Sequence, residues 1–170
     1  MQRLNIEIKA RCQYPERIRS LLQTLGADFI GEDHQVDTYF GVKQGRLKLR
    51  QGNIEQALIY YRRKDQPGPK KSEVLLYQPG SGTDLKQVLS AALEVSVIVD
   101  KVRSIYFIQN VKFHIDTVKG LGSFVEIEAI DKDGTIGAKR LNEQCRHFMD
   151  LLSIDPADLV DRSYSDLLQH

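Results

Sequence analysis

Three carboxylates in the second half of the chain have the spacing of a metal site built on paired strands. Asp116 ends one alternating run of polar and apolar residues, and Glu126 and Glu128 lie in a second such run. Side chains on a strand switch face at every residue, so each run presents its polar side chains on one face. Residues 119–122 contain two glycines and would fold the runs into a hairpin, which brings the three carboxylates together. Such a cluster needs cations or a hard divalent metal beside it.

The same alternation has a simpler interpretation. Acidic residues at every second position are also typical of the solvated outer face of an exposed strand. His114 shares the face of Asp116, where it either touches a substrate or forms a hydrogen bond with a carboxylate. The choice between a metal site and a solvated face depends on the rest of the chain.

Basic residues repeat this pattern in other parts of the sequence. They alternate with apolar residues, so each predicted strand has one charged face and one apolar face. The residues concerned are Lys9, Arg46, Lys48, Arg50, Lys101 and Arg103. Taken singly, each of these faces could be turned to water. Taken together, such strands can close into a barrel whose apolar face packs against helices and whose interior is a polar channel.

The periodicity predicts eight strands and three helices. The strands are expected near residues 4–11, 34–40, 46–51, 57–64, 72–77 and 95–106, and in the two arms of the hairpin. The first helix has Pro15 in its first turn and stops at Gly26, and two further helices are expected at residues 84–93 and 136–152. The predicted fold class is α+β, an eight-stranded antiparallel β-barrel with helices packed outside.

Composition limits the class of protein. The chain has 170 residues, 41% of them hydrophobic, which is enough for one domain with a core. Its formal net charge of +1 argues against a general nucleic-acid or membrane surface. No apolar run has the length of a membrane span and the first residues have no signal-peptide core, so we expect a soluble cytoplasmic protein. Cys12 and Cys145 fit no metal-ligand or redox spacing and are expected to be reduced thiols.

A channel that combines many basic side chains with a group of carboxylates suits one class of ligand. Basic side chains neutralise phosphate oxygens. Carboxylates hold Mg²⁺ or Mn²⁺, which bridges phosphates and offsets the charge that develops during phosphoryl transfer. The sequence therefore predicts a small-molecule triphosphate, ATP or a related compound, as the binding partner.

Seven segments carry a resemblance to a known family. They are NIEIKAR at 5–11, DTYF at 37–40, GRLKLR at 45–50, YYRRKDQPGPKKS at 60–72, VDKVRSIY at 99–106, HIDTVKGLGSFVEIE at 114–128 and SYSDLL at 163–168. In these segments the chain resembles the CYTH superfamily of triphosphate tunnel enzymes, most closely its class IV adenylate cyclase branch. The resemblance covers almost the whole chain and implies a single CYTH domain over residues 1–170. The family includes adenylate cyclases and thiamine, inorganic and RNA triphosphatases, all built as an eight-stranded tunnel.

The resemblance assigns roles residue by residue. It implies that Glu7, Asp116, Glu126 and Glu128 bind metal, and Glu73 falls where the family often has an acidic residue on the fifth strand. It implies that the triphosphate is held by Lys9, Arg46, Lys48, Arg50, Lys101 and Arg103. Arg63 and Lys70 fall in the segment that usually supplies another phosphate-binding cation.

One position departs from the family pattern. The family signature of the first strand is E-x-E-x-K, whereas this chain has Asn5, Glu7 and Lys9, the three residues to which the resemblance gives a catalytic role. A neutral amide can offer its carbonyl oxygen to a metal or to metal-bound water, but it is no carboxylate base. A hydrolase that uses this position to orient attacking water would lose more than a cyclase, whose nucleophile is the ribose hydroxyl of its substrate. The departure favours the cyclase branch and leaves open whether one or two metal ions bind.

Three functions stay open. The first is an adenylate cyclase that converts ATP to cyclic AMP and pyrophosphate. The second is a metal-dependent triphosphatase acting on a nucleoside, thiamine or inorganic triphosphate. The third is a non-catalytic module that binds nucleotides or polyphosphate. A homodimeric assembly stays open as well.

Overall fold

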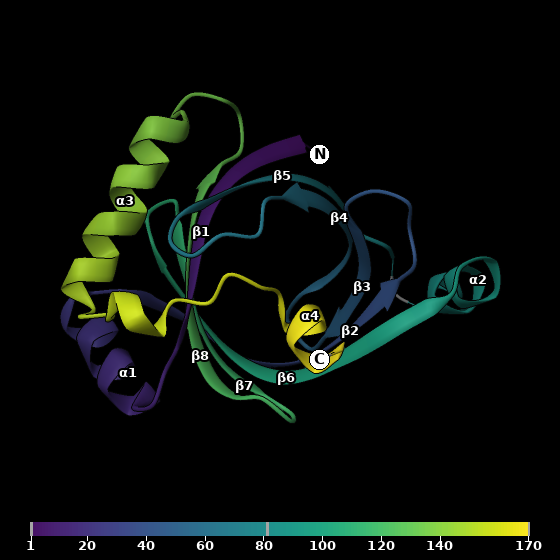
Figure 1. Ribbon diagram of the computed structural model, residues 1–170, viewed down its shortest axis with the longest axis horizontal. Coiled ribbons are helices and arrows are strands. Elements are labelled where there is room, and N and C mark those ends of the chain that lie inside the picture. Colours follow the sequence, from purple (N-terminus) through teal and green to yellow (C-terminus); the bar gives the residue numbers. More distant parts are fainter. Residues whose placement is uncertain (1, 81, 170) are drawn as a thin grey trace.

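The computed structural model describes residues 2–80 and 82–169, which form a closed antiparallel barrel of eight strands with helices around it (Figure 1). The strands follow one another around the barrel in the order β1-β5-β4-β3-β2-β6-β7-β8. Their bounds are β1 Gln2–Arg11, β2 Asp28–Phe40, β3 Arg46–Gly52, β4 Gln56–Arg63, β5 Lys70–Tyr77, β6 Val95–Ile108, β7 Val111–Val118 and β8 Gly122–Asp131. The predicted fold class is confirmed.

β1 closes the barrel because it pairs with two strands that are distant in the sequence. Its residues 2–7 pair with β5 and its residues 4–11 pair with β8. Alternation along β1 then separates two environments. Ile6 and Ile8 point outward into an apolar core, whereas Glu7 and Lys9 point into the barrel.

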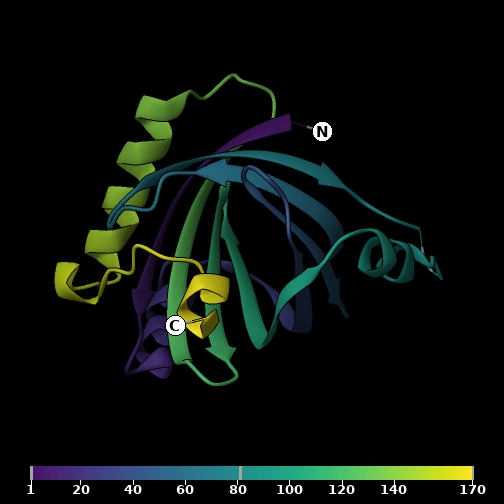
Figure 2. The ribbon, with the colours of Figure 1, turned by 45° about the vertical axis from the view of Figure 1, so that its right-hand side comes forward.

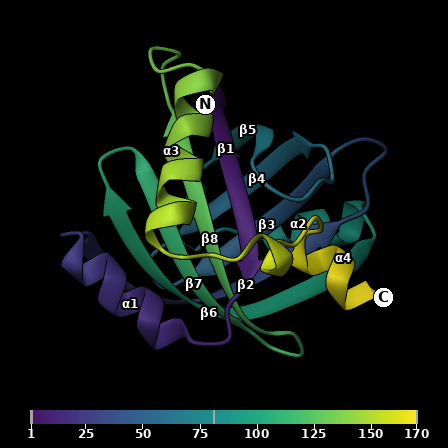
Figure 3. The same ribbon diagram turned by 60° about the vertical axis from the view of Figure 1, so that its left-hand side comes forward.

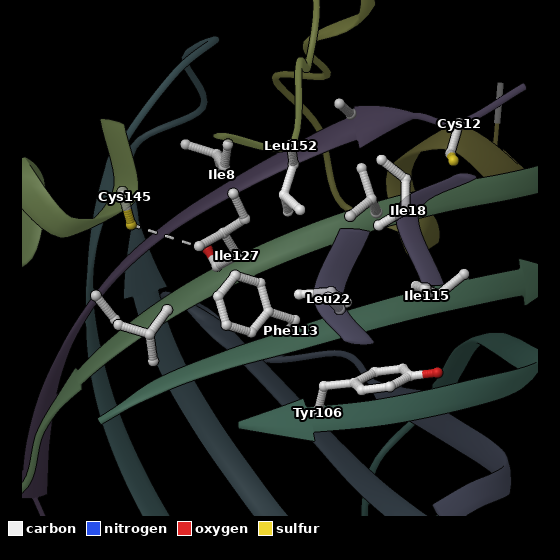
Figure 4. Close-up of a cluster of buried hydrophobic side chains, with 14 of the residues drawn as sticks. Ile8, Cys12, Ile18, Leu22, Tyr106, Phe113, Ile115, Ile127, Cys145 and Leu152 are labelled. Atoms are coloured by element: carbon white, nitrogen blue, oxygen red, sulfur yellow. Dashed lines mark hydrogen bonds between the residues drawn. The ribbon is translucent and has the colours of Figure 1, made fainter. Parts of the chain in front are cut away.

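Two helices cover one side of the barrel. α1 (Pro15–Thr24) and α3 (Ala138–Leu151) lie against the outer face of β1, β7 and β8 (Figure 3). The core between helices and sheet includes Leu22, Phe113 and Ile127, none of which is exposed (Figure 4). Burial of this apolar face is the main force that holds the helices on the sheet. Cys12 and Cys145 lie in the same core as free thiols.

The opposite side of the barrel is less covered. α2 (Leu85–Ala92) projects away from the strands (Figures 1 and 2), and none of its residues is buried. β2 begins at Asp28, six residues before the predicted start, and pairs with β6 along its length. The first residues of β2 are exposed, so hydrophobic alternation gives no sign of them. No helix among the described residues has the length and apolar character needed to cross a membrane.

The C-terminal segment closes one end of the barrel. A short 3-10 helix, η1 (Pro156–Asp158), leads to α4 (Tyr164–Gln169), which lies in front of the barrel opening in Figure 1. Tyr164 and Val160 pack with Tyr39, Val99 and Phe124 at the end of the barrel interior. Neither helix was predicted, because a helix of three or six residues is too short to have a hydrophobic period.

Candidate active site in the barrel interior

The barrel encloses a cavity of about 760 Å³ whose wall is rich in positive charge. Nine lysines and arginines and four glutamates line it. The basic residues are Arg3, Lys9, Lys48, Arg50, Arg63, Lys101, Arg103, Lys112 and Lys132, and the acidic ones are Glu7, Glu55, Glu126 and Glu128. Enclosed positive charge is costly unless an anion neutralises it. The cavity is therefore matched to an anionic ligand.

Asp37 organises three of these cations. Its carboxylate oxygens accept hydrogen bonds from Nε and Nη2 of Arg50 at 2.9 Å. One oxygen also accepts from the Nζ atoms of Lys48 and Lys101, both at 2.9 Å. Burial disfavours the charge of Asp37, but Arg50, Lys101 and Lys48 outweigh burial and hold its pKa well below the usual range. Asp37 was not among the predicted site residues.

Asp116 is paired in a similar way with Arg103. The guanidinium donates from Nε and Nη2 to the two carboxylate oxygens at 2.7 Å, and the Tyr164 hydroxyl donates to Oδ2 at 2.7 Å. Asp116 is fully buried and is not part of the cavity lining. Its role as a metal ligand stays a prediction, and in this structure Arg103 and Tyr164 occupy its oxygens.

Glu126 and Glu128 do line the cavity, two residues apart on β8. Oε1 of Glu126 lies 3.5 Å from Nζ of Lys9 and 3.6 Å from Nη2 of Arg103. Burial disfavours the charge of Glu126, but Lys9 and Arg103 hold its pKa well below the usual range. Both glutamates are therefore charged at neutral pH, since the pKa of Glu128 is also lowered despite burial, chiefly by Lys112.

Glu7 joins this group from the neighbouring strand. It lies directly across from Glu128 in the pairing of β1 with β8, and its carboxylate forms an ion pair with Arg63 of β4. Arg63 is buried, and its Nε and Nη2 have no hydrogen-bond partner. Three of the predicted ligands thus line the same cavity, together with an arginine that has two nitrogen atoms without hydrogen-bond partners.

Asn5 and His114 hold the two glutamates of β8 in place. Nδ2 of Asn5 donates to Glu128 at 2.5 Å, while its carbonyl Oδ1 is buried without a hydrogen-bond partner. Nδ1 of His114 lies 3.3 Å from Glu126, and burial, with Arg103, lowers the pKa of the imidazole. His114 is therefore neutral at neutral pH, and it lines the cavity as well.

The donor set of this region fits a hard divalent cation. Glu7, Glu126 and Glu128 offer only oxygen ligands, and Oδ1 of Asn5 is a buried oxygen that lacks a partner. Within residues 2–80 and 82–169, no three His, Cys, Asp or Glu side chains form a group that could hold a metal ion. Mg²⁺ is commonly held by one or two carboxylates together with substrate phosphates. The residues therefore fit an ion that binds together with a phosphate ligand.

Arg46 and Lys70 face the closed end of the barrel. Nη2 of Arg46 lies 2.5 Å from Asp166 of α4, and Nζ of Lys70 donates to the carbonyl oxygen of Val160 at 2.9 Å. Neither residue lines the cavity. The structure gives both a part in holding the C-terminal segment, and their contacts with phosphate stay predictions.

Glu73 requires a correction. Its side chain is 58% exposed on the outer face of β5, 3.9 Å from Lys71. The residues of β5 that face the cavity are its neighbours Ser72 and Val74, because side chains alternate along the strand. The prediction that Glu73 belongs to the metal-binding group is wrong.

Two further carboxylates shape the other end of the cavity and were missed in the sequence. Asp33 is fully buried and accepts hydrogen bonds from the backbone amides of Asn53, Ile54 and Glu55 at 2.6 to 2.9 Å. These bonds fasten the turn between β3 and β4 and direct Glu55 into the cavity, where it lies 2.5 Å from Nζ of Lys112. Contacts over such sequence distances leave no local pattern that sequence reading could detect.

Two lysines of the cavity change charge near neutral pH. Burial lowers the pKa of Lys101 to about 7, although Asp37 acts in the opposite direction. Burial lowers the pKa of Lys9 to about 8, although Glu126 acts in the opposite direction. The ammonium of Lys9 also lies 3.7 Å from the centre of the Tyr164 ring. A bound anion would raise the pKa of a neighbouring lysine, and a bound divalent cation would lower it.

Comparisons with known proteins identify the family of the chain and proteins of the same fold. The family model described as the CYTH domain matches residues 3–164. A Methanocaldococcus jannaschii protein named as a proposed adenylate cyclase is 24% identical, over 96% of this chain and 98% of that protein. A solved structure from Pyrococcus horikoshii has a TM-score of 0.77 and 25% identity over 96% of this chain and 98% of its own. A Hippeastrum protein, described as a proposed adenylyl cyclase with a dominant triphosphatase activity, has a TM-score of 0.57 and 16% identity over 96% and 93%.

Proposed function

Since the chain belongs to the CYTH domain family, we propose that it binds a triphosphate in the barrel cavity and acts on it with a divalent metal ion. The observation that carries this proposal is the charge of the cavity wall, where nine lysines and arginines face four glutamates. A triphosphate with its metal supplies negative charge for the excess of cations and a divalent cation for the carboxylate oxygens of the glutamates.

The cations around the proposed substrate differ in how they are held. Lys48, Arg50 and Lys101 are arranged by Asp37, so their positions are set before a ligand arrives. Arg63 has two buried nitrogen atoms without partners, which makes it the cation with the clearest need for a phosphate oxygen. Arg103 lies between Asp116 and Glu126 and can contact a phosphate at the metal-binding side.

Glu7, Glu126 and Glu128 would hold Mg²⁺ or Mn²⁺, with the carbonyl oxygen of Asn5 beside them. The ion would neutralise phosphate oxygens as charge develops on them. Lys9 faces Glu126 and has a pKa lowered by burial to about 8, so it can exchange a proton near neutral pH.

The reaction that we favour is the cyclisation of ATP. The ribose 3′ oxygen forms a bond to the α phosphorus, the bond from that phosphorus to the oxygen bridging the α and β phosphates breaks, and pyrophosphate leaves with its electron pair. The hydroxyl proton passes to a base, for which Lys9 in its neutral form is the candidate. The protein contributes alignment and charge, with no covalent intermediate. Support comes from Asn5, which replaces the carboxylate that a hydrolase would use to orient water.

A triphosphatase is the second candidate. The Hippeastrum protein of the same fold is described with a dominant triphosphatase activity, so the fold is compatible with attack by water. In that case the same cations and metal would act on the terminal phosphate.

Product analysis tests the proposal. The protein is incubated with ATP, thiamine triphosphate or inorganic triphosphate, each with Mg²⁺ or Mn²⁺ and, as a control, with EDTA. Cyclic AMP and pyrophosphate in equal amounts indicate the cyclase, and released phosphate indicates the triphosphatase. Binding without any product would reduce the function to that of a binding module. Failure to bind any of the three compounds would overturn the proposal as a whole.

A further inference from the structure

Of the four glutamates that line the cavity in the described part of the chain, Glu55 alone comes from a turn between strands, in residues 53–55 between β3 and β4. Its Oε2 accepts from Nζ of Lys112 at 2.5 Å, and its Oε1 accepts from Nε2 of Gln35 at 3.0 Å and lies 3.7 Å from Nη1 of Arg50. Burial disfavours the charge of Glu55, but Lys112 and Arg50 outweigh burial and hold its pKa far below the usual range. Glu55 is therefore a negative charge fixed among cations of the cavity wall.

Asp33 holds the turn that carries Glu55. Its carboxylate accepts hydrogen bonds from the backbone amides of residues 53–55 and from Nε2 of Gln35 at 2.8 Å. Gly52 precedes the turn, and a Cβ atom there would lie 2.7 Å from a carboxylate oxygen of Asp33, so only glycine fits this close approach. These contacts set the position of Glu55 before a ligand arrives.

The two ends of the barrel interior are limited in different ways. At one end, Arg46, the first residue of β3, contacts Asp166 of the C-terminal segment, whose helix α4 lies in front of the opening in Figure 1. β3 runs from Arg46 to Gly52, so the turn that carries Glu55 lies at the opposite end. Since the C-terminal segment occupies the first end, a longer phosphate chain can extend only toward Glu55.

The cations near Glu55 already have carboxylate partners. Lys112 is bound by Glu55 and lies directly across from Glu128 in the pairing of β7 with β8. Arg50 is paired with Asp37 and also lies near Glu55. A phosphate that reached this end would have to displace Glu55 from Lys112 or lie beside it, and two negative charges a few ångströms apart repel one another.

We propose that Glu55 determines the length of the phosphate chain that the cavity accepts, because it occupies Lys112 as an internal counter-ion and excludes a further phosphate from this end. This inference rests on the proposed function, since it requires that the cavity binds a triphosphate. It goes beyond that function in naming a specificity-determining residue and the class of ligand that it excludes. The excluded ligands are linear polyphosphates longer than a triphosphate.

Calorimetric titration in EDTA, with inorganic triphosphate and inorganic tetraphosphate as probes, tests the inference. The parent protein should bind the tetraphosphate no more tightly than the triphosphate. Glu55→Gln should bind the tetraphosphate at least about tenfold more tightly than the triphosphate, because Lys112 becomes available for a charge-assisted hydrogen bond with the added phosphate. Removal of both charges in Glu55→Gln/Lys112→Gln should abolish this preference. Glu32→Gln is the matched control, because Glu32 is exposed on β2 beside Asp33 and should leave the ratio of the two affinities unchanged.

The outcomes separate this inference from the proposed function. If Glu55→Gln keeps the melting temperature of the parent and the same ratio of affinities, the triphosphate site stands and the role of Glu55 is refuted. A parent protein that strongly prefers the tetraphosphate refutes it as well. Should Glu55→Gln fail to fold, Glu55→Asp keeps the charge in the turn but withdraws it from Lys112, so its ratio should shift toward the tetraphosphate, and an unchanged ratio refutes the inference. If neither compound binds the parent protein, the proposed function fails and this inference fails with it.

Discussion

Asp37 and Glu126 are both buried carboxylates inside the barrel with a lowered pKa, yet they are paired with cations in different ways. Asp37 accepts four hydrogen bonds at 2.9 Å from three cations, three of them at Oδ2 and one at Oδ1. Oε1 of Glu126 lies 3.5 and 3.6 Å from the nearest nitrogens of Lys9 and Arg103, beyond good hydrogen-bond distance. Glu126 lines the cavity, whereas Asp37 does not.

This difference in pairing indicates two different roles for buried carboxylates, which the alternating sequence pattern does not distinguish. A carboxylate that is paired closely with three cations and does not line the cavity is poorly placed to bind a ligand, so Asp37 serves to arrange cations. A carboxylate with loose ion pairs keeps lone pairs available, so Glu126 and its neighbour Glu128 can bind a metal ion. Removal of the first kind should cost stability, and removal of the second should cost activity.

The largest expected effect is the loss of stability in the variant Asp37→Asn. Three buried cations lose their counter-charge, and loss of one partner from a buried ion pair typically costs about 3–5 kcal/mol. We expect the free energy of unfolding, measured by urea titration, to fall by that amount. Added inorganic triphosphate should restore part of the loss, since it supplies the missing negative charge. A variant as stable as the parent would remove the distinction between Asp37 and Glu126.

Glu126→Gln and Glu128→Gln should instead lose activity while keeping their stability. Each removes a negative charge from the proposed metal site, and we expect activity to fall about a hundredfold or more, or about 2.7 kcal/mol in activation free energy. Circular dichroism should show an intact fold, and a Mn²⁺ titration should show weakened binding. Glu73→Gln, on the outer face of β5, is the control that should change neither property. Glutamine variants that bind Mn²⁺ like the parent would mean that the ligand group is wrongly assigned.

Arg103 connects the two kinds of carboxylate, because it is paired bidentately with Asp116 and lies near Glu126. Arg103→Lys keeps the charge and loses the paired geometry, since an ammonium cannot donate along two parallel directions. We expect triphosphate affinity to fall about tenfold, as measured by calorimetry. Arg103→Ala should weaken binding further, by about 2–4 kcal/mol relative to the parent. Equal effects of the two substitutions would indicate that only side-chain shape matters at this position.

The sequence was most informative where alternation is strict. The charged faces of β3, β7 and β8 follow from residues such as Lys48 and Glu126 at every second position, and the structure turns these faces inward. A closed barrel is the arrangement that turns these charged faces away from water, and the structure adopts it. α4 closes one end of the barrel but has only six residues, which is too short for a helical period of hydrophobic residues to be recognised in the sequence.

The partners of each carboxylate could not be read from the pattern. Asp116 and Glu126 share the same alternation, and only the register between β6 and β7 places Arg103 directly across from Asp116. Glu73 was misassigned for a related reason, because the pairing of Lys70 with Glu7 fixes which face of β5 is turned inward. Strand register depends on contacts that are distant in sequence, and a shift of one residue would exchange the two faces.

The cations arranged by Asp37 should give triphosphate binding a pH dependence. Burial lowers the pKa of Lys101 to about 7, and only its charged form attracts phosphate. Affinity should therefore be highest below pH 7 and fall several-fold as the pH rises to about 8, with a further contribution from Lys9. Lys101→Arg stays charged throughout this range and should flatten the first part of the profile. Identical profiles for parent and variant, measured by calorimetry, would show that Lys101 is charged at every pH tested.

The smallest expected effect concerns Asn5, which lies beside the carboxylates of the proposed metal site. Its amide donates to Glu128, so Asn5→Glu replaces a donor with a second negative charge. Two carboxylates in contact repel one another unless a cation lies between them, and we therefore expect Mn²⁺ to bind a few-fold more tightly to Asn5→Glu. The added carboxylate can also orient water, so the ratio of phosphate release to cyclic AMP should rise a few-fold with ATP. Asn5→Ala removes the donor without adding charge; it should weaken Mn²⁺ binding if the unpartnered carbonyl oxygen is a ligand, and otherwise leave it unchanged. Measurement of Mn²⁺ affinity and product ratio for the parent and both variants decides the matter. If all three proteins give the same product ratio, the first strand does not select between ribose hydroxyl and water, and the preference for cyclisation over hydrolysis loses its physical basis.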